Sequence, residues 1–275
     1  MDNLCYKYDK IMYNDKLFNN IDATYIIHLV GINKRLEHVK DQLLLYHPSN
    51  IVYIVNNKGY KNCKKKKFII NSVYDIIDCN LDIFNHAKKM NYNNILILED
   101  DFTFNSNIKN ETNNIDNFLN KHKNMSFQYY LGCLPLIMIP YDKYTYINKS
   151  IGTHSVIYSK KMRNEILLKK QEDIADWDLY NNFYNNRYTY YKPLCYQIFS
   201  ETENSEKWGA NILYFNKLNV LTVEIIKKIL KYNKLNRYSE PGFTNFYLFA
   251  KLFYYFLIII IILIGLYYNS YYYNL

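Results

Sequence analysis

The sequence predicts a mixed α/β domain followed by one membrane-spanning helix. Short apolar segments alternate with amphipathic ones over residues 23–98, an order typical of a parallel sheet with crossover helices. One apolar segment, residues 95–98, runs directly into three acids. Near the end of the chain, residues 252–268 form an uncharged stretch of 17 residues. With the apolar residues in front of it, this stretch reaches the roughly 20 residues that a bilayer span requires.

The composition fits one large globular domain or two small ones. The chain has 275 residues, of which 49% are hydrophobic, and a formal net charge of +9. A basic chain of this kind can act on nucleic acid, a membrane surface or an anionic substrate. The bias towards Asn, Lys, Ile and Tyr resembles AT-rich coding, so motifs built from these four residue types carry little weight.

The cysteines predict reduced thiols rather than a disulfide framework or a zinc site. There are five, an odd number, and no two are spaced as Cys-x-x-Cys. Residues 1–20 are polar and lack the apolar core of a signal peptide.

The first half of the chain contains three expected strands and two expected helices. The strands are residues 23–30, 51–55 and 95–98, each short, apolar and rich in β-branched side chains. Residues 34–45 carry one apolar stripe at helical spacing, and a second helix is expected at about 81–90. No Gly-x-Gly-x-x-Gly or P-loop motif follows any of these strands, so neither nucleotide fingerprint is supported.

The second half continues with elements of both kinds. We expect helices at 113–123, 160–170, 173–179 and 223–232, a strand at 152–159, and extended segments at 129–139 and 190–197. A Glu-Pro-Gly sequence at 240–242 indicates a hinge.

The acids that end strand 95–98 are the strongest chemical feature. Side chains alternate along a strand, so Glu99 and Asp101 are expected on one face and Asp100 on the other. Ligands of open α/β sheets bind at the carboxyl ends of the strands. Two carboxylates there suit Mg2+ or Mn2+ carrying a diphosphate. The alternative is a solvated acidic turn.

The sharpest basic cluster is Lys61 with the lysines at 64–67. No helix-turn-helix, zinc-finger or RNA-recognition pattern surrounds it. A solvated basic loop is therefore favoured over a nucleic-acid patch, and no nucleic-acid partner is expected.

Charge and aromatic residues around the apolar tail predict its topology. Tyrosines lie near both ends of residues 252–268, and Lys234, Arg237 and Lys251 precede the span, whereas no charged side chain follows it. The positive-inside rule then places residues 1–250 on the cytoplasmic side. The expected parts are an N-terminal extension, a folded domain, a juxtamembrane linker, the span and a short tail: residues 1–22, 23–235, 236–251, 252–268 and 269–275.

Four segments occur in a characteristic order along the chain: residues 25–29 with Arg35, residues 95–101, residues 152–159, and Asp176-Trp177 with 191–193 and Gln197. In this order they resemble glycosyltransferase family 25, the lipopolysaccharide-type and collagen-galactosyltransferase-like enzymes. The resemblance covers roughly residues 23–205. His28 stands where the family has Asn, and Ser155-Val156 replaces Ala-Tyr. The end of the matched region and the composition resemble giant-virus members, which implies a host or virion membrane.

The resemblance implies a GT-A-type fold and an inverting transfer that depends on Mn2+ or Mg2+. A hexose or N-acetylhexosamine would move from a nucleoside-diphosphate sugar, a UDP-sugar above all, to a hydroxyl of a protein or glycan. Glu99 and Asp101 would hold the metal, with Asp100 near the ribose or behind the ligands. Arg35 would meet the diphosphate, and Gln197 would contact the donor or substrate.

Inversion requires a base on the acceptor hydroxyl, and a carboxylate is the usual one. Asp176 is the first candidate and Asp178 the second, although an acid is also favoured at a helix N-terminus for purely structural reasons. His154 is a metal ligand, a substrate contact or a structural histidine. Arg35 is a phosphate contact or an ordinary residue on a helix surface.

Two other functions are compatible with the sequence. The first is that of an inactive family relative that binds glycans or proteins at a membrane. The second is that of a membrane-tethered nucleic-acid binder. Metal binding separates the first from the transferase, and salt-dependent binding to DNA identifies the second.

Overall fold

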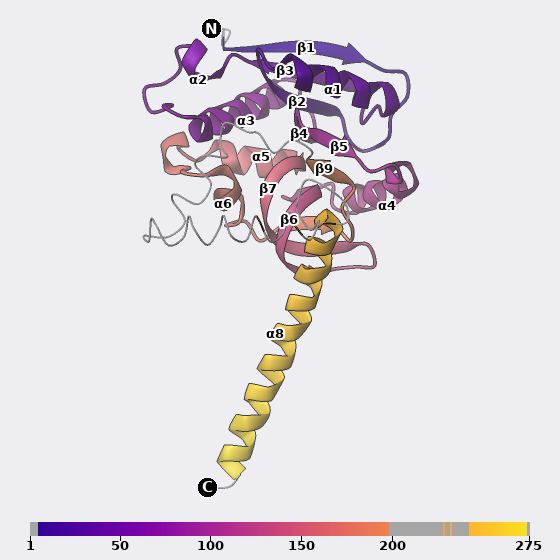
Figure 1. Cartoon of the computed structure of the whole chain (residues 1–275), viewed down its shortest axis with the longest axis vertical. Helices are drawn as coiled ribbons and strands as arrows, with labels where there is room; N and C mark the ends of the chain where they lie inside the picture. Colours follow the sequence, from indigo (N-terminus) through magenta and orange to yellow (C-terminus); the bar gives the residue numbers. More distant parts are fainter. Residues whose placement is uncertain (1–4, 198–227, 229–231, 233–241, 274–275) are drawn as a thin grey trace.

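The computed structural model describes residues 5–197, 228, 232 and 242–273. They form a mixed α/β fold with one long C-terminal helix (Figure 1), which confirms the predicted fold class. The expected helix at 223–232 lies outside the described residues. The main sheet has seven strands in the order β1-β3-β2-β4-β7-β6-β8, and β5 and β9 form a second, two-stranded sheet. The strands are β1 (Tyr6–Met12), β2 (Ala23–Leu29), β3 (Ile51–Asn57), β4 (Asn94–Glu99), β5 (Phe102–Phe104), β6 (Gln128–Pro140), β7 (Thr145–Ser159), β8 (Arg187–Tyr190) and β9 (Cys195–Gln197).

Strand β4 lies at the border between a parallel and an antiparallel half of the main sheet. β3, β2 and β4 are parallel neighbours, whereas β7 pairs antiparallel with β4 and β6 pairs antiparallel with β7. The chain runs from β2 outwards to β3 and then returns to the other side of β2 as β4. This reversal of strand order is the position at which open α/β sheets bind ligands.

The helices cover both faces of the sheet. They are α1 (Asn33–Leu45), α2 (Gly59–Asn62), α3 (Ser72–Lys89), α4 (Ile108–Lys121), α5 (Lys160–Leu167) and α6 (Trp177–Asn181). α2 was not expected from the sequence, α5 ends earlier than expected, and three helices begin several residues away from their expected starts. α3 begins at Ser72 instead of 81, where the Asn71 side chain accepts a hydrogen bond from the Tyr74 N–H. α4 begins earlier, at Ile108, and α6 begins later, at Trp177.

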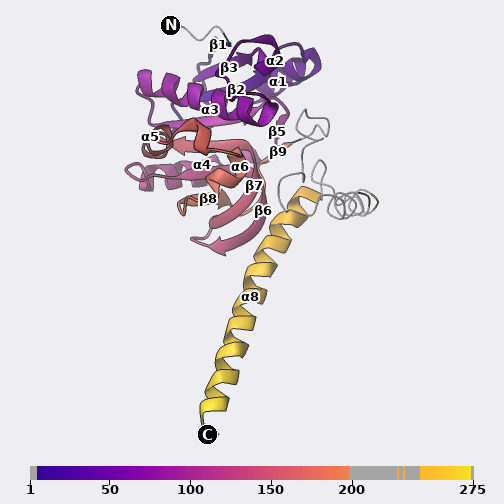
Figure 2. The ribbon, with the colours of Figure 1, turned by 90° about the vertical axis from the view of Figure 1, so that its left-hand side faces the viewer.

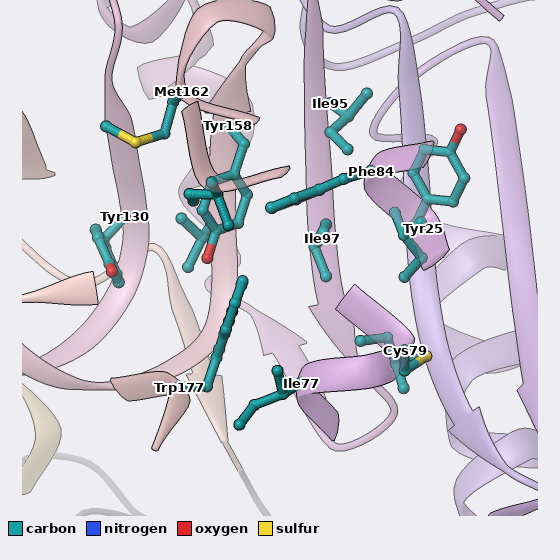
Figure 3. Packing of buried hydrophobic residues seen from close by; sticks show 14 of the residues in the cluster. Tyr25, Ile77, Cys79, Phe84, Ile95, Ile97, Tyr130, Tyr158, Met162 and Trp177 are labelled. Atoms are coloured by element: carbon teal, nitrogen blue, oxygen red, sulfur yellow. The ribbon is translucent and has the colours of Figure 1, made fainter. Parts of the chain in front are cut away.

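Alternation along the strands separates two apolar cores. Ile95 and Ile97 of β4 belong to the core under α3, α5 and α6, whereas Leu96 and Leu98 belong to the core under α1 and α4. Figure 3 shows the first core, in which Phe84 of α3 lies 5.0 Å from the ring of Tyr158 and 5.9 Å from that of Trp177. All of these side chains are buried, so both faces of β4 stabilise the fold through apolar burial.

The N-terminal residues extend the sheet, and one cysteine prediction is wrong. β1 pairs antiparallel with β3, with Tyr6 opposite Asn57. This pairing brings Cys5 next to the end of α2, where it forms a disulfide with Cys63. The two residues are 58 positions apart, so their proximity depends on strand pairing and not on a local motif. The other three cysteines are free and buried.

The C-terminal helix, α8 (Gly242–Tyr273), is continuous from the folded domain into the apolar tail (Figures 1 and 2). Residues Gly242–Asn269 are long and apolar enough to cross a membrane. The sequence predicts a linker at residues 236–251. In the structure, Phe243, Tyr247 and Ala250 of this range are instead buried in the domain core.

Replacing Gly132 by alanine is expected to lower the free energy of unfolding by about 1–3 kcal/mol or more. A Cβ at this position in β6 would lie 1.9 Å from the Cys195 carbonyl oxygen of β9, so the two strands would have to separate. Chemical unfolding of the full chain in detergent measures the effect. Gly265→Ala is the matched control, because nothing lies within 4 Å of its added Cβ. Equal stability of the two variants would contradict the close approach of β6 and β9.

Candidate functional site

The three acids occupy the carboxyl end of β4, and Asp100 is held by two basic side chains. The strand ends at Glu99, and Asp100 and Asp101 form the turn that leads to β5. His28 Nδ1 lies 2.8 Å from one carboxylate oxygen of Asp100, and Arg35 Nη1 lies 2.8 Å from the other. A carboxylate accepts only, so His28 donates at Nδ1. Both Asp100 and His28 are buried.

The positions of His28 and Arg35 follow from the parallel pairing. Ile27 of β2 is opposite Glu99, so His28 and Asp100, one residue further along each strand, turn to the same face. That face is covered by α1, whose first turn carries Arg35. His28, which the sequence shows only as a departure from the family pattern, is therefore a direct partner of Asp100.

Asp101 is completely buried, and only one of its two carboxylate oxygens has a hydrogen-bond partner among the described residues. Its Oδ2 accepts a hydrogen bond of 3.1 Å from Gln197 Nε2 and lies 3.7 Å from Arg35 Nη1. The pairing of Phe102 with Gln197 between β5 and β9 brings this amide into place. The second oxygen, Oδ1, has no hydrogen-bond partner among the described residues. A buried carboxylate oxygen without a partner is costly and is suited to a cation or a ligand donor.

Glu99 lies on the other side of the cluster, towards α6. Burial raises the pKa of Glu99 well above its usual range, and the charges of Asp101, Asp178 and Asp100 add to this, whereas Arg35 opposes it. Burial also raises the pKa of Asp101 to about 6, with Arg35 again opposing. Adjacent carboxylates disfavour each other's ionisation. Perturbed acids grouped in this way mark candidate functional sites.

Asp178, the second candidate base, comes from α6 and faces this cluster. Its Oδ2 accepts a hydrogen bond of 2.9 Å from the backbone N–H of Gly152. Gly152 has a φ of 86°, a backbone conformation that residues with a Cβ rarely adopt. Burial raises the pKa of Asp178, and the hydrogen bonds from Gly152 and Thr153 lower it. Gly152 and Thr153 of β7 thus position the carboxylate of Asp178, which belongs to α6.

Asp176, the first candidate base, has a structural role in this arrangement. Its side chain accepts a hydrogen bond of 2.8 Å from the Leu179 N–H and so caps α6. The helix begins one residue after Asp176, and this start directs Asp176 along the helix axis and Asp178 towards β7.

His154 of β7 lies behind the acids, between β9 and α8. Its Nε2 is 3.4 Å from the Cys195 carbonyl oxygen, and since a carbonyl only accepts, this nitrogen is the donor. Its ring meets Phe243 of α8 edge-on, with centroids 5.7 Å apart. The side chain is buried.

A metal ion at this site would require additional coordinating atoms from a bound ligand. Within the described residues, no group of three or more His, Cys, Asp or Glu side chains is arranged to hold one. Glu99 and Asp101 nevertheless remain as two oxygen donors, one of them with the unsatisfied Oδ1. Mg2+ is commonly bound by one or two carboxylates together with substrate phosphates. Two carboxylates alone would therefore need further oxygens from a phosphate-bearing ligand to complete a metal site.

Comparisons with known proteins assign no family. No family model matches the chain, and no curated protein matches its sequence. Among solved structures, the chain is similar to a glycosyltransferase involved in the glycosylation of the major capsid of PBCV-1, with a TM-score of 0.40 and 9% identity. The match covers 70% of this chain and 100% of that one. Likeness at this level supports neither a family assignment nor a function.

Glu99→Gln is expected to stabilise the protein at pH 8 in the absence of divalent ions, and to do so less at pH 4. A carboxyl group whose pKa is raised by folding binds more protons in the folded state, so its contribution to stability falls as pH rises. The neutral amide does not ionise, so the variant does not lose stability in this way as pH rises. Chemical unfolding at several pH values measures the free energy of unfolding of both proteins, with the exposed Asp41→Asn as control. A destabilisation of equal size at all pH values would contradict the repulsion among these acids.

Asp176→Ala is expected to lower the free energy of unfolding by about 1 kcal/mol, the usual value of a helix N-cap. Asp176→Ser retains an oxygen for the Leu179 N–H and should recover most of this loss. Thermal unfolding of both variants provides the comparison. If serine restores nothing, the capping role is wrong.

Proposed function

We propose that the chain is a membrane-anchored glycosyltransferase. It would transfer a hexose or N-acetylhexosamine from a nucleoside-diphosphate sugar, preferentially a UDP-sugar, to a hydroxyl of a protein or glycan. The observation that carries the proposal is the grouping of Glu99, Asp101 and Asp178 where the strand order reverses at the carboxyl end of β4. Sugar-diphosphate chemistry requires charge stabilisation for a leaving phosphate and a base for the acceptor.

Glu99 and Asp101 would hold Mn2+ or Mg2+ together with the diphosphate oxygens of the donor. The ion would neutralise negative charge that develops on the leaving diphosphate. Arg35, in the first turn of α1, is anchored by Asp100 and is close enough to the acids to supply a further positive charge. Asp100 would orient Arg35 and His28, and Gln197 would orient Asp101 through its amide.

Asp178 would be the base that removes the proton of the acceptor hydroxyl. Gly152 holds one of its oxygens, and the raised pKa of its carboxyl group favours proton uptake. As the acceptor oxygen bonds to the anomeric carbon, the bond from that carbon to the diphosphate breaks, and the configuration inverts. Asp176, which the resemblance ranks first, caps α6 and is the weaker candidate in this geometry. His154 would support β9, which carries Gln197.

The proposal also includes the side of the membrane on which the folded domain lies. The basic residues before the span favour the cytoplasmic side of a host or virion membrane for the folded domain. The Cys5–Cys63 disulfide is the observation against this placement, because disulfides are rare where cellular thiols are kept reduced.

The full-length protein in detergent is expected to release nucleotide slowly from one member of a panel of UDP- and GDP-sugars, and only with Mn2+ or Mg2+. Glu99→Gln and Asp101→Asn should abolish this release while leaving the protein folded. Asp41→Asn, which removes an exposed carboxylate on α1, should leave it unchanged. Near-normal release by both site variants would remove the metal assignment.

Asp178→Asn is expected to reduce the turnover number far more than the affinity for the donor, because the lost group acts on the acceptor. Nucleotide binding by calorimetry, beside steady-state kinetics, separates the two effects. A loss confined to donor affinity would reassign Asp178 to donor binding. A wild-type protein with neither nucleotide release nor metal-dependent nucleotide binding would instead be a membrane-tethered binding module.

A further inference from the structure

The first turns of α8 are built into the folded domain. The Phe243 ring meets Tyr196 with centroids 5.4 Å apart, in addition to its contact with His154. The Tyr247 hydroxyl lies 3.6 Å from Cys133 Sγ and 3.2 Å from Thr189 Oγ1. Because the helix is continuous beyond these contacts, the domain has a fixed orientation relative to the apolar segment.

The outward face of the same turns is already apolar. Leu248 is 49% exposed and Phe249 58% exposed, although both precede the uncharged stretch that begins at Leu252. Large apolar side chains that continue a spanning segment without a break are suited to lipid. The turn from 247 to 251 therefore has one face against protein and one face suited to lipid.

Lys251 connects the start of the span to the edge of the sheet. Its Nζ donates to the Tyr191 carbonyl at 2.6 Å and lies 5.0 Å from the centre of the Tyr146 ring. Tyr146 of β7 is half-buried, and its pKa is raised by burial and by the nearby Tyr255. The sheet edge at Tyr146 therefore lies level with Lys251 and with the first turn of the span.

The tip of the β6–β7 hairpin, residues 140–146, lies at the same level. Tyr191 donates from its backbone N–H to the Tyr144 carbonyl at 2.8 Å, which ties the tip to the residue whose carbonyl accepts from Lys251. Figures 1 and 2 show the two strands reaching the lower edge of the domain beside α8. Tyr141 and Lys143 of this tip are exposed.

The composition of this edge suits lipid headgroups. Tyrosine prefers the membrane interface because its ring is apolar and its hydroxyl is polar, and lysine adds attraction to anionic lipids. A hollow of about 190 Å3 lies between α4 and the hairpin tip, and both Lys121 and Lys143 line it. One acid, Asp142, also lines it.

We propose that the hairpin tip 140–146 and the first turns of α8 form one surface that rests on the bilayer, with anionic headgroups as its partner. The proposal does not depend on the transferase assignment. Two contacts with the membrane fix the height and the tilt of the domain. Phe243, which touches His154 beside the acids, is nine residues before Leu252, or about 14 Å along a helix. The candidate site therefore lies close above the headgroup layer.

Fluorescence quenching in nanodiscs tests this surface with the full-length protein. Lys143→Cys, and Asp142→Cys as an independent second variant, would carry an environment-sensitive dye. Met12→Cys is the matched control, since Met12 is 61% exposed on β1, the opposite edge strand of the sheet. The free native cysteines are buried and should not label in the folded protein.

Headgroup-level spin-labelled lipids should quench most of the fluorescence at 142 and 143 and little of it at 12. Replacing phosphatidylglycerol by phosphatidylcholine should weaken the quenching at 142, where Lys143 is retained. Quenching at 142 and 143 as low as at 12 would overturn the proposal, as would strong quenching at all three positions. Equal quenching at 142 in both lipids would overturn the preference for anionic headgroups.

Discussion

Three consecutive carboxylates at the end of a buried strand are the constraint on which the candidate site depends. Asp100 is compensated on one face of the sheet by His28 and Arg35. Glu99 and Asp101 have no comparable compensation, and burial raises the pKa of both. A fold that retains such an unfavourable group in its centre gives up stability there, and this is the usual sign of a site selected for ligand binding or chemistry.

The position of β4 between the two halves of the sheet explains how so many elements reach these acids. The parallel half contributes His28 from β2 and Arg35 from α1. The antiparallel half contributes Gly152 of β7, whose backbone N–H holds Asp178 of α6. A purely parallel sheet would place another crossover helix beside β4. Here β7 runs back along β4, and its early residues pass the carboxyl end of the strand, where they orient groups from outside the sheet.

The apolar patterns in the sequence predicted β2, β3 and β4, because these strands are buried and their own residues are mostly apolar. The early start of α3 was missed because its first turns carry Asp75 and Asp78, whose partners come from distant segments. The disulfide was missed for a similar reason, since only the pairing of β1 with β3 brings Cys5 to Cys63. The choice between Asp176 and Asp178 depends on the residue at which α6 begins, because a start at Trp177 makes Asp176 the N-cap and leaves Asp178 in the first turn.

The acids and the membrane segment are linked through a short series of direct contacts. Gln197 orients Asp101, the neighbouring Tyr196 packs on Phe243, and Phe243 opens the helix that enters the apolar tail. A chain cut before Tyr247 would lose the hydroxyl that meets Cys133 and Thr189 and would expose a buried part of β6 to water. The folded domain therefore includes the helix up to Lys251. The first turn of α8 and the candidate site therefore share one set of packed side chains, in which Phe243 contacts both His154 and Tyr196.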